Sequence, residues 1–373
     1  RGNPTRALNS STYVTTLVFI VLTALANLAF GFEWRVWGAS VVGLLVGVVI
    51  GFASDYFTDD TKKPVHNVAK ASETGPAFTI LSGVSYGFLS ALPSMVGIAI
   101  SALAAYKLCY PIGGLDTAMY GIAMSAVGML SIVGMIVSND AYGPIVDNAR
   151  GLAEMGNLGD DVLDTTDALD SAGNTVKAVT KGFAIGSAAL TALALLVSYV
   201  DVVNAKTASI IDLKLTNPAV LVGIFVGAML TFVFSALTMS GVQRAAQSIV
   251  VEVRRQFREI AGIMEGTADP DYASCVDLCT RGALHEMVAP SLLAIIVPVI
   301  TGLLLGPEAV VGLLGGVTVT GFAMAVFMSN AGGAWDNAKK YIESGKHGGK
   351  GSECHKAAVI GDTVGDPFKD TSG

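Results

Sequence analysis

Charged side chains are scarce in this sequence. Only 14% of its 373 residues are Asp, Glu, Lys or Arg, whereas 52% are hydrophobic and the mean hydropathy is +0.60. Soluble globular domains carry about a quarter charged residues, so this balance excludes a soluble globular enzyme and a disordered chain. The formal net charge of −7 also excludes a nucleic-acid partner, because little would neutralise a phosphate backbone.

Residues and motifs with specialised chemistry are also few. The chain has only four cysteines and four histidines, and they are dispersed. Cys275 and Cys279 have three residues between them, not the two usual in zinc or redox pairs. A Gly-x-x-x-x-Gly-Lys-Ser/Thr loop is absent, which excludes nucleotide binding of the P-loop kind.

Long apolar stretches, in contrast, are abundant, and 43 glycines accompany them. A helix needs about 20 apolar residues to cross roughly 30 Å of hydrocarbon, and small residues let such helices pack closely. The sequence therefore predicts an all-α, polytopic transmembrane helix bundle with about eight full spans and the start of a ninth near Lys356. The predicted spans cover residues 13–31, 36–54, 78–106, 118–139, 182–200, 219–240, 288–305 and 308–328.

Basic residues are unevenly distributed between the two sides of this topology. Of the 23 Lys and Arg residues, those on the short-loop side are only Arg35, Lys107, Lys206 and Lys214. Positive charge is enriched in cytoplasmic loops, so the long loops are predicted to be cytoplasmic. No linker divides residues 1–373, and we predict a single membrane domain. Because the chain begins with Arg1, we expect it to be a piece of a longer protein.

Acidic residues gather where the predicted spans meet the cytoplasmic side. Asp140 and Asp147 are seven residues apart, so both carboxylates face one way if a helix continues through Pro144. Asp140 directly follows an apolar run, which favours a cavity or pathway. Asp147 fits either a ligand or a solvated helix end.

A second cluster runs into the fifth predicted span. Asp164, Asp167 and Asp170 fit either a solvated helix face or a site, and both alternatives stay open. Asn174 lies at the lip of the span, where a purely structural role is harder to argue. Lys177 fits either a site or a side chain that snorkels to the membrane interface.

Two more clusters lie near the end of the sequence. Asp336 and Lys339 are one helical turn apart, at the cytoplasmic end of the eighth predicted span. The last cluster is a predicted helical stripe of carboxylates spaced four residues apart, with a lysine beside it: Asp362, Asp366, Asp370 and Lys369.

This mixture of side chains points to a particular chemistry. Carboxylates held close together repel unless cations lie between them. Magnesium prefers oxygen ligands, and proteins bind it through carboxylates together with substrate phosphates. Lysines supply point charges for the phosphate. The clusters therefore predict a site for Mg²⁺ and a phosphate compound at the cytoplasmic mouth of the bundle.

The clusters also carry a family resemblance. The chain resembles the membrane-bound ion-translocating pyrophosphatases, of the proton-pumping, K⁺-independent type, and looks like their C-terminal half without the end of the last helix. The family's acidic substrate motif and its ion gate, which belong to earlier helices, are absent. The matching segments are Asp140–Asn148, Asp167–Asn174, Lys181–Ser187, Gly332–Lys339, Gly351–Lys356 and Gly361–Gly373.

The resemblance implies a role for each residue of the clusters. Asp370 matches an aspartate that orients the attacking water, and its partner belongs to the half not present. The positions that match magnesium ligands are Asp147, Asn174, Asp336 and Asp366. Those that match diphosphate-binding lysines are Lys339 and Lys369, and those that match acidic positions lining the funnel are Asp140 and Asp362.

Two further positions bear on potassium. K⁺-dependent members of the family have Ala at the position of Lys177, and K⁺-independent proton pumps have Lys there with Thr at the position of Thr180. A tethered ammonium can replace a bound K⁺. One departure from the family is Arg150, which stands where Gly is usual.

The expected function is Mg²⁺-dependent hydrolysis of inorganic diphosphate, coupled to pumping protons out of the cytoplasm. The expected assembly is a homodimer in a lipid bilayer, and half of the protein by itself is expected to be inactive. The alternative is a transporter of Mg²⁺ or of a phosphate compound that carries out no hydrolysis, because carboxylate-lined bundle mouths also occur in transporters.

Overall fold

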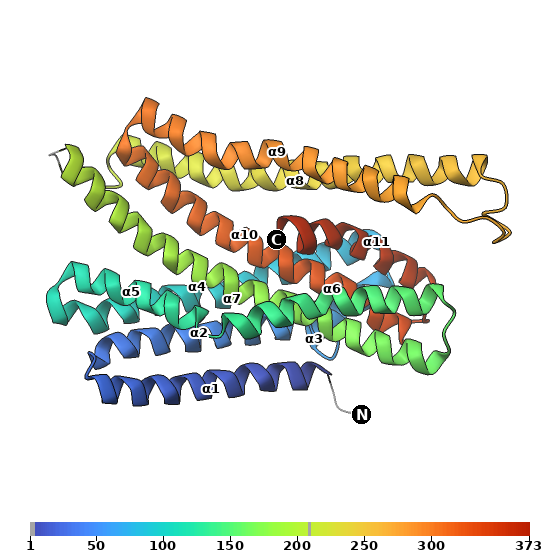
Figure 1. The fold of residues 1–373 in the computed structure, drawn as a ribbon, viewed down its shortest axis with the longest axis horizontal. Coiled ribbons are helices and arrows are strands. Elements are labelled where there is room, and N and C mark those ends of the chain that lie inside the picture. The colour runs from blue at the N-terminus through green and yellow to red at the C-terminus, as the bar shows by residue number, and fades with distance from the viewer. Residues whose placement is uncertain (1–3, 208–209) are drawn as a thin grey trace. The chain divides into compact units, whose positions relative to one another are not determined.

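The computed structural model describes residues 4–207 and 210–373, and these residues form helices and connecting loops without a strand. Figure 1 shows their course. The helices are α1 (Pro4–Phe30), α2 (Trp34–Thr58), α3 (Lys63–Ser72), α4 (Pro76–Gly113), α5 (Leu115–Leu130), α6 (Val133–Met155), α7 (Asp160–Thr207), α8 (Pro218–Glu259), α9 (Tyr272–Leu305), α10 (Pro307–Glu343) and α11 (Glu353–Pro367), with a π-helical turn at Phe368–Ser372. The all-α prediction is confirmed.

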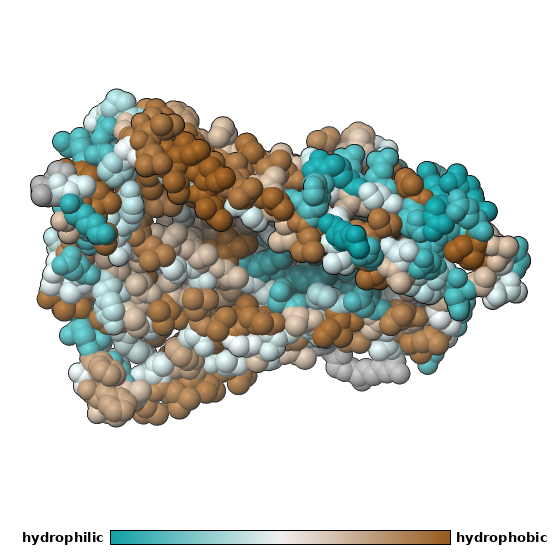
Figure 2. Space-filling model, turned by 45° about the horizontal axis from the view of Figure 1, so that its top comes forward, coloured by the Kyte–Doolittle hydropathy of each residue, from teal (hydrophilic) through white to brown (hydrophobic). Residues whose placement is uncertain are grey.

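The helices have the length and composition of membrane spans. Among the described residues, seven are long and apolar enough to cross a bilayer, and the number rises to eight if α5 and α6, which meet at a 46° bend, form one broken span. Large apolar side chains are exposed along them, as Figure 2 shows for one face. The chain is therefore an integral, multi-pass membrane protein, and the eight predicted spans all fall on these helices. The start of α11 agrees with the helix expected near Lys356, and its extension into a ninth span stays a prediction.

The described residues divide into two compact units. The first contains α1 to α7, the later part of α10 from Thr318 onward, and α11. The second, Asp212–Val317, contains α8, α9 and the beginning of α10. The prediction that the chain forms one membrane domain stays a prediction.

Glycines allow close helix packing in the second unit. A Cβ atom on Gly223 or Gly227 of α8 would lie about 2 Å from a backbone oxygen of α10. The reverse holds for Gly312 and Gly316 of α10, whose Cβ atoms would meet backbone oxygens of α8. Two small-x-x-x-small pairs therefore face each other, as expected of membrane helices.

The first unit packs around α2, α4, α5 and α7, which contact one another extensively. Gly128 of α5 lies so close to α2 that a Cβ atom would be 1.8 Å from the Ser40 carbonyl oxygen. Near the other end of the unit, the fully buried Trp335 of α10 donates its indole N–H to the Thr79 carbonyl of α4 at 2.9 Å. Gly361 of α11 leaves room for that ring. These contacts hold α4, α10 and α11 together beside the charged clusters.

Candidate functional site

A charged cavity of about 160 Å³ lies between α6, α7, α10 and the C-terminal segment, within the first unit. Every residue that lines it has an ionisable side chain. The lining residues are Asp147, Arg150, Asp170, Asp336, Lys339, Lys340, Glu343, Asp362, Asp366 and Lys369. The structure thus brings together residues of all four clusters seen in the sequence, with one residue each from the first two, Asp147 and Asp170, and several from the last two.

Asp336 occupies the centre of this cavity. Its carboxylate is buried, and Oδ2 accepts a hydrogen bond from the Lys369 ammonium. Its Oδ1 lies 3.3 Å from Lys339 Nζ and 3.7 Å from Lys340 Nζ. Three ammonium groups therefore surround a single carboxylate, and their combined charge needs further anions nearby.

Each of these lysines has a second carboxylate of its own. Lys339 Nζ donates to Asp362 at 2.5 Å, and Lys369 Nζ lies 3.1 Å from Asp366. Lys340 Nζ donates to Asp170. The cavity consequently contains three lysine and carboxylate pairs arranged around Asp336.

Three of the carboxylates also meet the requirements of a metal site. Oxygen atoms of Asp336, Asp362 and Asp366 all lie within 4.8 Å of one another. The Oδ1 atoms of Asp336 and Asp362 are buried and accept no hydrogen bond from the described residues. Buried polar atoms are normally satisfied, and hard cations such as magnesium take carboxylate oxygens. The residues present therefore fit a divalent cation.

Asp140 and Asp147 both face α7, as predicted, because α6 continues through Pro144. Thr180 Oγ1 donates to Asp140 at 2.9 Å, and Lys177 Nζ lies 3.7 Å from Asp147. Of the two carboxylates only that of Asp147 lines the cavity.

Lys177 reaches Asp147 by crossing Gly143 of α6. A Cβ atom at position 143 would lie 2.5 Å from the Lys177 Cε atom, so a larger residue there would force the lysine stem to shift. The Lys177 side chain is buried, with 10% of its surface exposed. It does not snorkel to an interface.

Asn174 lies beside the cavity, in a buried cluster of amides rather than on the cavity wall. Its Nδ2 donates to Asn337 Oδ1 at 3.2 Å, and its own Oδ1 is buried without a partner among the described residues. Asn337 is fully buried and donates to the Thr58 carbonyl at 2.7 Å and to Ser171 and Thr175 at 3.2 Å. Asn337 thus joins the end of α2 to α7 and α10.

Asp370 does not line the cavity, and its side chain is exposed. The predicted stripe is broken because α11 ends at Pro367 and a π-helical turn follows. A π turn contains more residues than an α turn, which changes the direction of the following side chains. The Lys181 ammonium donates to the backbone carbonyls of Lys369 and Gly373 in this turn.

Sequence reasoning missed the Asp170 and Lys340 pair. Asp164 and Asp167 are exposed or half-buried, whereas Asp170 is 1% exposed. Its position four residues before Asn174, on the same face of α7, is the sequence pattern that singles it out. Lys340 follows Asp336 at the same spacing.

Arg150 is a further cation that lines the cavity. Its guanidinium donates to Asp167 at 2.8 Å and to Glu154, and it lies 3.9 Å from Glu343. It therefore ties α6 to α7 and to the end of α10 at the edge of the cavity.

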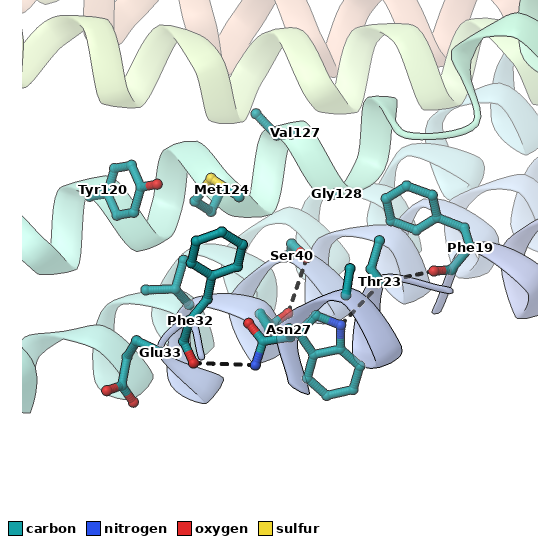
Figure 3. Close-up of a pocket in the computed structure, with 13 residues that line it drawn as sticks. Phe19, Thr23, Asn27, Phe32, Glu33, Ser40, Tyr120, Met124, Val127 and Gly128 are labelled. Carbon is teal, nitrogen blue, oxygen red and sulfur yellow. Dashed lines mark hydrogen bonds between the residues drawn. The ribbon is translucent and has the colours of Figure 1, made fainter. Parts of the chain in front are cut away.

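A second, larger cavity lies in the same unit, between α1, α2 and α5 (Figure 3). Its volume is about 450 Å³, and most of its lining is apolar, including Phe19, Met124 and Val127. Some of the polar groups there are paired with each other, as in the hydrogen bond of 3.1 Å from Trp37 Nε1 to Thr23. None of the residues predicted for a site lies in this apolar pocket.

One motif match has no suitable context. Residues 83–87 read Gly-Val-Ser-Tyr-Gly and fit the Gly-x-Ser-x-Gly pattern of serine hydrolases. That pattern requires a turn between a strand and a helix. In the structure the segment lies inside α4, so it forms no nucleophile elbow.

The chain is a bundle of membrane-length helices with a cavity lined by carboxylates and lysines. It is therefore a polytopic membrane protein with a candidate ionic site. The particular family follows from sequence comparison. The family model described as "Inorganic H+ pyrophosphatase" matches residues 1–373, and the chain belongs to this family.

Several relatives are similar over the whole chain. A protein of Clostridium tetani named "Putative K(+)-stimulated pyrophosphate-energized sodium pump" is 53% identical over 375 residues, which cover 100% of this chain and 54% of the relative. A "K(+)-insensitive pyrophosphate-energized proton pump" of Methanosarcina mazei is 51% identical, covering 99% of this chain and 54% of the relative. A protein of Moorella thermoacetica named with the same activity is 46% identical, with 100% and 55% covered. The chain thus spans about half the length of these relatives.

Proposed function

We propose that the protein to which this chain belongs hydrolyses inorganic diphosphate and uses the energy to pump protons out of the cytoplasm. The observation that carries the proposal is the arrangement around Asp336, where three lysines and three nearby carboxylates form one cavity. Magnesium-neutralised diphosphate needs anionic oxygens for the metal and cations for the phosphate, and both are supplied there.

The proposed roles follow from the positions of the side chains. Asp336 and Asp366, together with Asp147 across the cavity, would hold Mg²⁺, which neutralises the charge of the diphosphate when it is bound. Asn174 would contribute its unpartnered Oδ1 from beside the cavity. Asp362 keeps the Lys339 ammonium in place by a hydrogen bond of 2.5 Å.

The lysines and the remaining aspartates complete the proposal. Lys339 and Lys369 would bind phosphoryl oxygens once a metal occupies the carboxylates that they now contact. Asp370 would orient the attacking water together with a residue outside this chain. Its exposed position within the π turn leaves it accessible to such a partner. Asp140, which accepts a hydrogen bond from Thr180, would line the funnel that leads to the cavity.

Hydrolysis is tested in the full-length protein in membranes. We expect phosphate release from diphosphate that requires Mg²⁺ and that falls about a hundredfold or more in Asp366→Asn, because electrostatic contacts to a reacting phosphate have this magnitude. Asp277→Asn, which removes an exposed carboxylate paired with Arg281, is the matched control and should retain activity. Binding and transport of Mg²⁺ or phosphate without any hydrolysis would instead favour a transporter.

Potassium independence is a separate proposal. The Lys177 ammonium is buried, tethered beside Asp147 and held over Gly143, so it places a fixed monovalent charge next to Asp147, which lines the cavity. We expect K⁺ to leave hydrolysis by the wild-type protein unchanged and to stimulate Lys177→Ala. K⁺ stimulation of the wild type would contradict the proposal and would favour the kind of activity named for the Clostridium relative.

The pumped ion, the sidedness and the assembly also need tests. In sealed vesicles we expect diphosphate to drive proton uptake without a requirement for Na⁺, and to act only from the side that exposes the long loops. Diphosphate-driven ²²Na⁺ uptake would contradict proton pumping. Chemical crosslinking in native membranes should yield a homodimer, and a monomer across all crosslinker concentrations would exclude it.

A further inference from the structure

Asp170 and Lys340 form an ion pair that none of the roles above uses. Their side chains are only 2% and 9% exposed, and the ammonium donates directly to Asp170 Oδ2. Removing two charges from water is costly, and such a pair gives little net stability compared with apolar residues of the same volume. Both residues line the charged cavity, so a ligand in that cavity explains the cost of burying the pair better than folding does.

Lys340 has the same surroundings as the two lysines proposed to bind phosphate. Like Lys339, it lies within 4 Å of Asp336 Oδ1, and like Lys369 it contacts one additional carboxylate. An ammonium group has three N–H bonds. Asp170 and Asp336 are the two carboxylates within reach of Lys340, so one N–H remains for a ligand in the cavity even while both contacts persist.

The three pairs differ in what a metal would do to them. Asp362 and Asp366, the partners of Lys339 and Lys369, belong to the carboxylate group that fits a divalent cation, whereas Asp170 does not. A metal would compete with Lys339 and Lys369 for their carboxylates. Lys340 would keep Asp170 and would therefore stay where it is.

Resting on the proposed function, we propose that Lys340 is a third lysine that contacts the diphosphate, and that Asp170 is the positioning residue that holds its ammonium toward the cavity. Lys339 and Lys369 would lose their carboxylates to the metal and contact phosphate instead. Lys340 would keep its carboxylate and supply a fixed positive charge.

The test is binding of Mg²⁺ with methylenediphosphonate, a diphosphate analogue whose bridging carbon resists hydrolysis, to the full-length protein. Hydrogen bonds to charged groups contribute about 1.5–3 kcal/mol, so Lys340→Met should weaken analogue binding roughly 10- to 100-fold. Lys340→Arg should restore most of the affinity because it keeps the charge. Lys356→Met, which removes an exposed lysine paired with Glu353, should bind like the wild type.

A double-mutant cycle separates positioning from mere stabilisation. Asp170→Asn alone should weaken analogue binding several-fold, and in the Lys340→Met background it should weaken it no further, because its effect passes through the lysine. The melting temperature of each ligand-free variant is recorded in parallel. A loss of thermal stability with analogue affinity unchanged within twofold would overturn the proposal and leave the pair a structural one.

The same measurements distinguish this inference from the proposed function. If the wild-type protein neither binds the analogue nor hydrolyses diphosphate, the proposed function itself fails. If the wild type binds and Lys340→Met binds equally well, only the role of Lys340 is wrong. Independent effects of Asp170→Asn and Lys340→Met would overturn the positioning role of Asp170 alone.

Discussion

The two cavities of the first unit are built on opposite principles. The larger one, between α1, α2 and α5, has mostly apolar walls, and several of its polar groups bond to one another. The smaller one is lined only by ionisable side chains, several with buried oxygen atoms that accept no hydrogen bond from the described residues. In a low-dielectric surrounding, unpaired buried polar groups are costly. The smaller cavity is therefore the proposed site, because of its buried charges and not because of its volume.

The largest expected effect comes from removing the charge at the centre of the smaller cavity. Asp336→Asn leaves three buried ammonium groups without their shared anion, and breaking a buried pair costs about 3–5 kcal/mol. We expect the variant to lose diphosphate hydrolysis and to denature at a lower temperature, measured by phosphate release and by thermal unfolding in detergent. Asp116→Asn, an exposed carboxylate in the first turn of α5, is the control. If Asp336→Asn hydrolyses diphosphate and unfolds like the wild type, the charged cavity has no more effect on activity or stability than the apolar pocket.

Asn337→Leu should have the next largest effect. The substitution removes an amide that bonds α2, α7 and α10, and each buried group left without a partner costs about 1–3 kcal/mol. We expect a loss of about 2–4 kcal/mol in unfolding free energy. Asn67→Leu, at an exposed amide with a single bond to Tyr86, should cost well under half of this. Equal losses of unfolding free energy at both sites would show that the buried amide cluster stabilises the fold no more than an exposed amide does.

Gly128→Ala tests the packing next to the apolar pocket. The new Cβ atom would collide with the backbone of α2 at Ser40, and overpacking of this kind costs about 1–3 kcal/mol. Gly134→Ala on α6 is the matched control, because nothing lies within 4 Å of its Cβ position. It should be neutral or stabilising by up to about 1 kcal/mol. Thermal unfolding of both variants shows whether the close backbone contact is what requires glycine. Equal destabilisation by Gly128→Ala and Gly134→Ala would mean that the contact is not the cause.

The smallest effect is expected inside the apolar pocket. Met124→Leu changes the shape of the wall but neither charge nor volume by much, so we expect less than about 1.5 kcal/mol of destabilisation and unchanged diphosphate hydrolysis. A large loss of hydrolysis in this variant would assign the apolar pocket a direct part in the reaction and reverse the comparison.

Hydropathy and helical spacing predicted the fold and part of the site. The apolar runs correspond to the observed helices, and the seven-residue spacing of Asp140 and Asp147 correctly indicated that both face one way. Spacing along one helix cannot identify the partner on another helix. For this reason the ion pair of Asp170 with Lys340 was missed, although both residues lie in segments already singled out.

Two local features also lay beyond the reach of the sequence pattern. The stripe of Asp362, Asp366 and Asp370 presumed a regular α-helix, whereas the chain enters a π-helical turn after Pro367. Near α6, the fit of Lys177 over Gly143 depends on the approach of two helices, which no single-helix period contains. The helical period thus predicted which residues share one face of a helix. Tertiary packing decided which residues of different helices lie close in space.

The burial of Trp335 gives the protein an optical reporter. This indole is fully buried one residue before Asp336, while Trp37 lines the apolar pocket and Trp34 is 48% exposed. Indole emission shifts with the polarity and charge of its surroundings. Trp37 therefore reports on the apolar pocket that it lines, and Trp335 on the neighbourhood of Asp336. In a variant that keeps only Trp335, with Phe at the other two tryptophan positions, ligand binding at the charged cavity should change the emission, and a brominated lipid should not. In a variant that keeps only Trp37, the brominated lipid should quench the emission.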